Sequence, residues 1–321
     1  MKKFNEIFID KTKYGEKIQT SEYEKQGKHI IVDQGQAEIA GYTNREEGLF
    51  NEVPVIIFGD HTRLIKYIDE PFFLGADGVK VLRSKEKNAN YKYLYYALKS
   101  AKIPNTGYNR HFKWLKDVEI NYPDSVKQEK IVDILDRVSD VIEKRKAELS
   151  YLVTLIKARF VEMFGDPIRN TQNRPTTEFI NVVKMQRGFD LPVQDRQQDG
   201  EIPVYGSNGA LDYHNVAKIH GGVITGRSGT IGKVFYTEGD FWPLNTSLFS
   251  ADTHGNNVIY LGYLLQLFDL TRFVEGTGVP TLNRNMFHNK QIIDVPIDEQ
   301  RVFAAFVNEI DKSKLQKFSA A

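Results

Sequence analysis

The chain has 321 residues, a formal net charge of +1, 41% hydrophobic residues and no cysteine. This length suits two domains of about 150 residues, and the apolar content argues against global disorder. The absence of cysteine excludes disulfide bonds and thiol catalysis. Because the N-terminal segment is polar and no apolar run reaches the length of a membrane span, we expect a cytoplasmic protein. With so little net charge, any polyanion site must come from local clustering or from a partner protein.

Read in chain order, five blocks of sequence recur at a shift of about 170 residues. Each copy begins with short apolar strands cut by Gly, Asn and Asp turns, continues through an amphipathic helix and a polar loop, and ends in a second helix. The matched blocks are 27–44 with 200–215, 53–73 with 222–242, 93–100 with 260–267, 105–123 with 276–296, and 128–138 with 299–310. Five matches in the same order indicate a tandem duplication.

The helix that ends the first copy is predicted to be long. Ser125 can cap its start, and Gly165 with Pro167 marks its end. Apolar residues follow a heptad pattern that Arg145 and Arg159 interrupt, at Ile131, Leu135, Val138, Ile142, Leu149, Leu152, Ile156 and Met163. About 40 helical residues span about 60 Å, more than a domain of this size covers, so we expect pairing with another long helix. The natural mate begins near Glu299 and carries Phe303, Val307 and Ile310 on the same stripe.

The segment ITGRSGTIGK (224–233) is rich in glycine but does not fit a nucleotide-binding loop. A Walker loop requires a glycine five residues before Gly232, where Arg227 stands, and a hydroxyl residue after Lys233, where Val234 stands. The sequence that follows reads as a strand, whereas such a loop opens a helix. We therefore predict a tight turn between strands. Two roles remain open for it: backbone amides and Arg227 that contact DNA phosphate, or a purely structural turn.

Other catalytic patterns are also missing. No Asp or Glu is followed two residues later by Lys, as common restriction nucleases require after Pro123-Asp124, and the cofactor and catalytic loops of a DNA methyltransferase do not occur. The seven histidines lack metal-ligand spacing, and no Gly-x-Ser-x-Gly elbow is present. A Ser/His/Asp triad is not ruled out by sequence, but the chain reads as non-catalytic, with no metal and no cofactor.

The order of these motifs resembles the specificity subunit of Type I restriction–modification systems over essentially the whole chain. The motifs that carry the resemblance are PVYGSNG, TGRSGTIGKV, LNRNMF ahead of VPIDEQ, and the helix QEKIVDILDRVSDVI that ends in RFVEMFGDP. The resemblance implies an α+β fold: two tandem β-rich target-recognition domains joined by long helices that pair as an antiparallel coiled coil, with pseudo-two-fold symmetry.

The expected boundaries are a first recognition domain at 1–123, a spacer helix at 124–170, a second recognition domain at 171–296 and a short second helix at 297–321. The resemblance further implies that each domain reads one half of a split double-stranded DNA target. The helices would set the gap and dock two methyltransferase subunits, and a motor–nuclease subunit would bind the assembly. Two departures stand out: the second helix is shorter than the family's, and IFGDHTRL in the first copy lacks the Arg-Ser-Gly-Thr of the second.

Base and phosphate contacts favour Arg, Lys, Asn, Gln, His and hydroxyl side chains on exposed loops. The candidates in the first domain are His61, Arg63, Asn109, Arg110, His111 and Lys113. Those in the second are Arg187, Ser207, Asn208, Arg227, Ser228, Thr230, Asn283 and Arg284. The alternative for each is an ordinary solvated or turn-forming residue. The rival for the whole chain is a non-catalytic protein-interaction adaptor, which the clusters NRHFK and TLNR at equivalent repeat positions disfavour.

Overall fold

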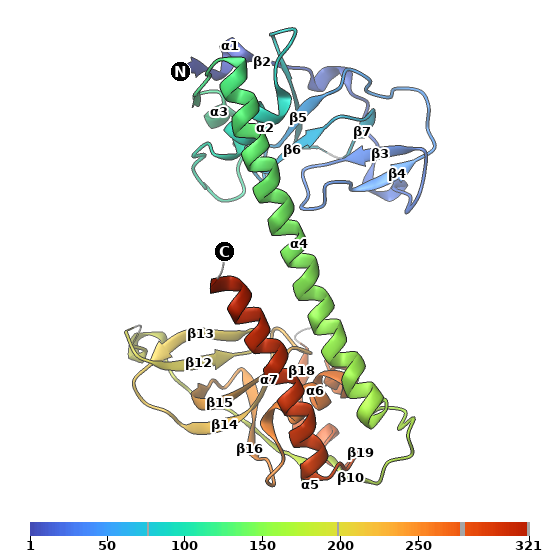
Figure 1. Cartoon of the computed structure of the whole chain (residues 1–321), viewed down its shortest axis with the longest axis vertical. Coiled ribbons are helices and arrows are strands. Elements are labelled where there is room, and N and C mark those ends of the chain that lie inside the picture. Colours follow the sequence, from blue (N-terminus) through green and yellow to red (C-terminus); the bar gives the residue numbers. More distant parts are fainter. Residues whose placement is uncertain (76, 198, 277–279, 320–321) are drawn as a thin grey trace. The chain divides into compact units, whose positions relative to one another are not determined.

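The structure is a computed structural model that describes residues 1–75, 77–197, 199–276 and 280–319, with side chains described as far as residue 313. It divides into two compact units, Met1–Lys144 and Arg145–Ala321 (Figure 1). Both units combine helices with β-sheets, so the predicted α+β class is confirmed. Within the described part of the chain, no helix is both long enough and apolar enough to cross a bilayer.

Unit 1 is built on a four-stranded antiparallel sheet and a three-stranded sheet. The first has the order β2 (Phe8–Asp10), β8 (Val79–Ser84), β5 (Val55–Gly59), β6 (Ile65–Ile68), and the second β4 (Gly41–Thr43), β3 (His29–Val32), β7 (Phe72–Leu74). A further pair joins β1 (Lys2–Lys3) to β9 (Glu119–Ile120), and the short helices are α1 (Phe4–Ile7), α2 (Tyr91–Lys99) and α3 (Phe112–Leu115). Every residue of β5 is buried, which makes this strand the centre of the unit.

Helix α2 covers the four-stranded sheet and shows how sequence sets the local fold. The side chain of Asn90 accepts a hydrogen bond from the backbone N–H of Tyr93 at 2.9 Å, which caps the first turn. Tyr93, Leu94 and Leu98 then form its buried face and pack toward β5 and β6. The cap and the apolar face together fix where the helix begins and which side faces the core.

Unit 2 is built on one six-stranded sheet. Its order is β11 (Lys184–Arg187), β16 (Ser247–Asp252), β14 (Ile219–Gly226), β15 (Val234–Pro243), β12 (Ile202–Gly206), β13 (Gly209–His214). Two small pairs join β10 (Thr176–Glu178) to β19 (Gln291–Ile293) and β17 (Val274–Glu275) to β18 (Thr281–Leu282). The helices are α5 (Phe179–Val182) and α6 (Val258–Phe268), and α6 packs on β14 and β15.

The predicted duplication is visible in the strand order of the two units. The order β2-β8-β5-β6 in unit 1 corresponds to β11-β16-β14-β15 in unit 2. In unit 1, β3 runs parallel to β7, and in unit 2, β12 runs parallel to the end of β15. The long strand β15 therefore pairs with β14 as β6 pairs with β5, and with β12 as β7 pairs with β3. One six-stranded sheet in unit 2 thus corresponds to two sheets in unit 1.

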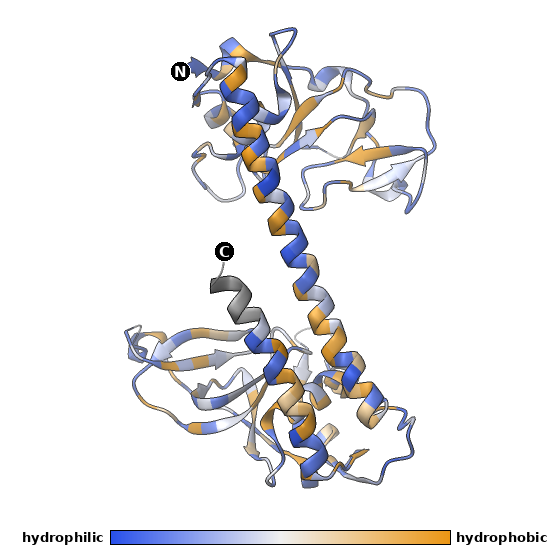
Figure 2. Cartoon of the chain, viewed as in Figure 1, coloured by the Kyte–Doolittle hydropathy of each residue, from blue (hydrophilic) through white to orange (hydrophobic). Residues whose placement is uncertain are grey.

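Helix α4 runs from Ser125 to Phe164, which confirms the long helix predicted from the heptad pattern. Figure 2 shows apolar residues recurring along it among polar ones. Its cap differs from the prediction: the Asp124 carboxylate accepts from the backbone N–H of Lys127 at 2.9 Å, so Asp124 has the role expected of Ser125. Gly165 ends the helix with a φ of +82°, a left-handed conformation that glycine adopts without strain.

Helix α7 (Ile297–Ser319) packs antiparallel against the last turns of α4, within unit 2. The ring of Phe303 lies 5.3 Å from that of Phe160 and 5.7 Å from that of Phe164, and the Arg159 guanidinium lies 5.9 Å from the Phe306 ring. Burying each aromatic side chain contributes about 1.5–3 kcal/mol. The middle of the predicted stripe is different, because Val138 and Ile142 of α4 remain exposed.

Candidate nucleic-acid interface

The segment that joins β14 to β15 is a tight turn between two strands, as predicted. The backbone N–H of Arg227 donates to the carbonyl of Thr246 at 2.9 Å, and the Thr225 hydroxyl donates to the carbonyl of Lys233 at 2.9 Å. Gly226 is required here, since a Cβ at this position would lie 1.8 Å from the carbonyl oxygen of Thr230. These bonds fix the backbone of the turn and therefore the positions from which its side chains project.

The turn closes one side of a cavity of about 290 Å³ in unit 2. The carbonyl of Arg227 accepts from the N–H of Leu282 at 2.8 Å, and Ser228 pairs with Thr281 in a β-bridge. These contacts bring three distant segments together, and the cavity is lined by Arg187, Arg227, Leu248, Thr281, Leu282, Asn283, Arg284 and Asn285. Four of the eight lining residues, Arg187, Arg227, Asn283 and Arg284, are predicted DNA contacts.

This cavity, the arginine cavity, has a strongly basic lining. Its walls carry three guanidinium groups and no carboxylate, and among the described residues no ion pair involves Arg187, Arg227 or Arg284. The pKa of the neighbouring His288 is lowered, first by burial and then by the positive charges of Arg284 and Lys184. Arginines that line one cavity without a carboxylate partner favour an anion, and the guanidinium geometry suits a phosphate.

The remaining candidates of unit 2 flank this turn. Ser207 and Asn208 form the turn between β12 and β13, and the Asn208 side chain accepts from the Lys233 ammonium at 2.7 Å. Ser228 and Thr230 are partly exposed on the β14–β15 turn itself. None of these four lines the arginine cavity, so they extend the polar surface around it. The matched block 276–296 also includes residues 277–279, which lie outside the described residues.

Unit 1 has an equivalent surface with different chemistry. The carbonyl of Asp60 accepts from the N–H of His111 at 2.7 Å, as that of Arg227 accepts from Leu282 in unit 2. Asp60 therefore stands where unit 2 has Arg227. It is only 2% exposed, and its carboxylate accepts from the N–H of Phe112 at 2.7 Å. This buried carboxylate stabilises the start of α3. Because it is negatively charged and enclosed, it cannot bind a phosphate.

Burial overturns one candidate of unit 1. The side chain of His111 is 0% exposed, and its Nδ1 lies 3.0 Å from the carbonyl oxygen of Asp60. The prediction that His111 contacts DNA is therefore wrong, because the ring anchors the loop from inside. Within the cluster NRHFK, Arg110 and Lys113 are exposed, whereas His111 and Phe112 between them are buried.

The other candidates of unit 1 lie on two adjoining loops. His61 and Arg63 occupy the β5–β6 turn, where Arg63 has a left-handed φ of 62°. Asn109 and Arg110 are exposed on the segment that leads into α3. Lys113 is exposed within that helix, and its ammonium lies 4.1 Å from the Trp114 ring centre. The two loops meet where Tyr108 stacks on His61, with ring centres 4.7 Å apart and planes inclined by 9°. Sequence reasoning missed Tyr108, since an aromatic residue is usually assigned to the core.

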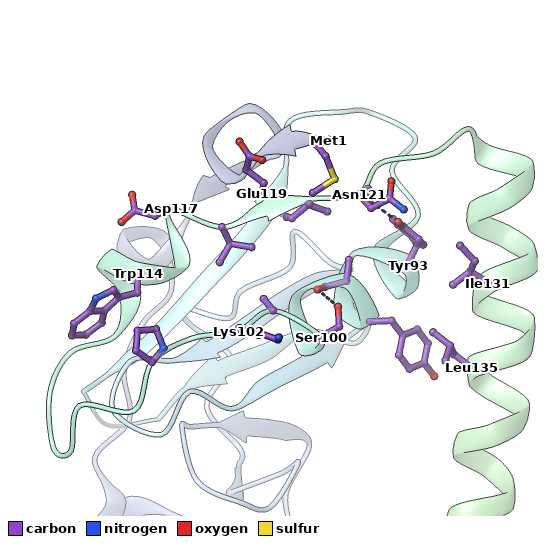
Figure 3. A pocket seen from close by; sticks show the side chains of 16 residues that line it. Met1, Tyr93, Ser100, Lys102, Trp114, Asp117, Glu119, Asn121, Ile131 and Leu135 are labelled. Carbon is purple, nitrogen blue, oxygen red and sulfur yellow. Dashed lines mark hydrogen bonds between the residues drawn. The ribbon is translucent and has the colours of Figure 1, made fainter.

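Unit 1 contains a largely apolar groove of about 720 Å³ between α2, α3 and the first turns of α4. Figure 3 shows the side chains of Tyr93, Trp114, Ile131 and Leu135 around it. Unit 2 differs at the corresponding place, because Phe160 packs there against Tyr260 and Phe303. The groove carries none of the predicted DNA contacts.

Two units of one topology, linked in sequence by a single long helix, define a duplicated β-rich module. The family model of the Type I restriction modification DNA specificity domain matches residues 1–151 and again residues 170–318, and the chain belongs to this family. It is also similar to the Type I restriction enzyme EcoR124I/EcoR124II specificity subunit of Escherichia coli, with 29% identity over 133 residues. That match covers 37% of this chain and 33% of the relative, so it spans about a third of the relative's length.

Solved structures show the same fold. The S subunit of the Type-I restriction-modification system from M. genitalium superposes with a TM-score of 0.61 at 18% identity, covering 99% of this chain and 91% of that one. A chain from a structure on complex assembly and conformational transition of the type I R-M system gives a TM-score of 0.50 at 14% identity, with 91% and 86% covered. At these identities the likeness establishes the shared fold.

Proposed function

We propose that this chain is the DNA-recognition subunit of a Type I restriction–modification complex, with no catalytic role of its own. Each recognition domain, 1–123 and 171–296, reads one half of a bipartite double-stranded DNA target. The helices at 124–170 and 297–321 set the gap between the halves and dock two methyltransferase subunits, and a motor–nuclease subunit joins through that assembly. Its place is the cytoplasm, where the DNA is.

The observation that carries this proposal is the arginine cavity of unit 2. Arg187, Arg227 and Arg284 come from three separate segments, and no carboxylate lines the space between them. A protein-interaction adaptor has no need of such a cluster, whereas each Arg–phosphate contact made there adds counterion release to DNA binding. Asn283 lies on the same wall and can make paired hydrogen bonds to adenine in the major groove.

The remaining proposed contacts lie on loops or in the short helix α3 and are partly or fully exposed. In unit 1 they are His61, Arg63, Asn109, Arg110 and Lys113, and in unit 2 Ser207, Asn208, Ser228 and Thr230 join the cavity residues. The net charge of +1 fits a subunit that shares its DNA with partner subunits, which then supply part of the electrostatic attraction.

The test is to assemble the chain with the methyltransferase subunits encoded beside it and expose the complex to random duplexes and S-adenosylmethionine. Sequencing of the methylated positions should give one motif with two specified halves and an unspecified gap. The methyltransferase subunits without this chain should give no motif. If the complex assembles but methylates without sequence preference, the chain is an adaptor and the proposal is wrong.

A further inference from the structure

Unit 1 lacks the feature that best supports DNA contact in unit 2. At the position of Arg227 it has the buried Asp60, so the equivalent surface cannot form an arginine cavity. An exposed aromatic side chain, Tyr108, lies at this place, and 88% of it is accessible to solvent. It stands between two candidate loops, directly over the turn that corresponds to the Arg227 turn.

The loop that carries Tyr108 is held in a defined shape. The Asn109 side chain donates to the carbonyl of Thr106, and the N–H of Gly107 donates to the Asn105 side chain at 3.2 Å. Gly107 has a φ of +76°, which a β-carbon would oppose. The Thr106 hydroxyl lies 3.4 Å from Nε2 of the buried His111. Because these hydrogen bonds already order the loop, binding through Tyr108 at its tip does not require a further loss of loop entropy.

His61 supports the tip from behind. Its backbone N–H donates to the Gln34 side chain at 3.0 Å, and the Gln34 amide donates to the carbonyl of Asp77 at 2.9 Å. These bonds hold the backbone of His61 beside the segments that follow β3 and precede β8, and the Tyr108 ring stacks on the imidazole from there. One face of the phenol ring rests on this support, and the ring's remaining surface is open to solvent.

We propose that Tyr108 is a specificity-determining residue of unit 1, whose ring packs on the bases of its half-site with His61 as a positioning residue. An aromatic ring has the flat apolar surface that packs on a thymine methyl group or enters a flexible pyrimidine–purine step. The exposed cations that follow it in the chain, Arg110 and Lys113, hold nearby phosphates. This inference rests on the proposed function and names the residue that reads bases in unit 1.

The experiment uses the complete chain assembled with its methyltransferase subunits, and duplexes carrying the motif from the methylation assay. Tyr108→Ala should weaken binding to the target about 5- to 150-fold, the range expected from aromatic–base stacking. Binding to unrelated duplexes should change little. The slope of log affinity against log salt should stay as in the wild type, because no charge is removed. Tyr108→Phe keeps the ring and should bind as the wild type does.

Lys113→Ala is the matched contrast on the same segment. It should weaken target and unrelated DNA alike and reduce the salt slope by about 0.9, as one lost phosphate contact does. Tyr108→Ala binding with wild-type affinity and an unchanged methylation motif would overturn the inference and leave the proposed function standing. Equal losses for Tyr108→Phe and Tyr108→Ala would also overturn it, since the hydroxyl group would then make the contact. A wild-type complex without any motif would overturn both.

Discussion

Gln128 and Gln300 hold equivalent places in the two units and make the same hydrogen bond. Each side-chain amide donates to a carbonyl five residues earlier, that of Pro123 at 2.8 Å and that of Val295 at 2.7 Å. Both glutamines are buried, at 5% and 1% exposure. The bond ties the first turns of α4 and of α7 to the segment before them, so the duplication preserves an interaction as well as a topology.

Gln300 has the larger network, which leads to a first prediction. Its Oε1 also accepts from the N–H of Asn257 at 2.8 Å, and its amide donates to the Asn256 side chain at 2.6 Å. Gln300→Ala should therefore lower the free energy of unfolding of unit 2 by about 1–3 kcal/mol, because buried polar groups lose their partners. Gln128→Ala removes the bond to Pro123 and an interaction with the Tyr122 hydroxyl, a smaller network, and should cost unit 1 about 1 kcal/mol. Equal losses in the two units would contradict this account.

The two tryptophans allow the units to be followed separately in urea. Trp114 belongs to unit 1 and Trp242 to unit 2, and the sequence has no others. Replacing one by Phe leaves the fluorescence of the other as the reporter of its own unit. The unfolding of each stability variant is measured in one of these two single-tryptophan proteins.

A second prediction compares Phe160, which fills the site between α6 and α7 in unit 2, with Ile131, which borders the open groove of unit 1. Phe160 is fully buried between Phe164, Tyr260 and Phe303, with ring centres 4.9, 5.6 and 5.3 Å away. Phe160→Ala should therefore destabilise unit 2 by about 3–5 kcal/mol. Ile131→Ala should destabilise unit 1 by less than about 2 kcal/mol, because that side chain borders the open groove and leaves no enclosed cavity. A larger loss for Ile131→Ala, read from Trp114, would show that the groove is filled.

The helices and the repeat were predictable because their signals are local or periodic. The heptad stripe of α4 and the glycine after it define both ends of the helix within the sequence itself. The merging of two strands into β15 was not predictable, since it depends on which neighbours the strand meets along its length. The cap at Asp124 was displaced by one residue, because Asp and Ser cap helices equally well.

The candidate site was predictable by residue type but not by arrangement. Arg187 and Arg227 lie 40 positions apart in sequence, and only the pairing of β11, β16 and β14 brings them to one cavity. His111 was misjudged because its burial depends on the distant Asp60. Tyr108 was missed for the opposite reason: hydrophobic pattern predicts burial, and a loop held by its own hydrogen bonds can keep an aromatic ring exposed.

A third prediction concerns pH and the site of His288. Its Nε2 accepts from the backbone N–H of Met185 at 3.1 Å, which requires the neutral ring. Its pKa is lowered by burial and then by Arg284 and Lys184, so the unfolded chain binds a proton more readily than the folded one. This contribution to stability is fully present above the unfolded value of about 6.5 and is lost as the pH falls below it. Unfolding of unit 2, read from Trp242, should show this loss between pH 8 and pH 5.

His288→Gln should flatten that dependence, because glutamine can accept the Met185 bond without titrating in this range. The matched control is His220→Gln, whose side chain is 80% exposed. The control should keep the pH dependence of the wild type. If His288→Gln also keeps it, other groups cause the loss of stability in acid.

A fourth prediction tests whether the two domains read independently. Exchanging residues 1–123 for the matching domain of a relative should alter one half of the methylated motif, because the loops of unit 2 are untouched. The other half and the methyltransferase subunits serve as internal controls in the same assay. A change in both halves would mean that recognition is shared between the domains.

The fifth prediction separates the two roles open to Arg227. Arg227→Ala removes one of three guanidinium groups from the cavity and leaves the backbone bonds of the turn in place. If Arg227 holds a phosphate, the complex should lose affinity for all duplexes alike, and the salt slope should fall by about 0.9. If it reads a base, the loss should be about 1–3 kcal/mol and confined to one position of the motif.

The control is Arg169→Ala, at an exposed arginine of unit 2 outside the cavity. It carries the same charge change and should leave the motif and the affinity unaltered. Because Arg227 takes part in the turn's hydrogen bonds only through its backbone, unfolding followed through Trp242 should be nearly unchanged. Wild-type affinity and motif for Arg227→Ala would therefore reduce the turn to a structural element and remove the cavity from the DNA interface.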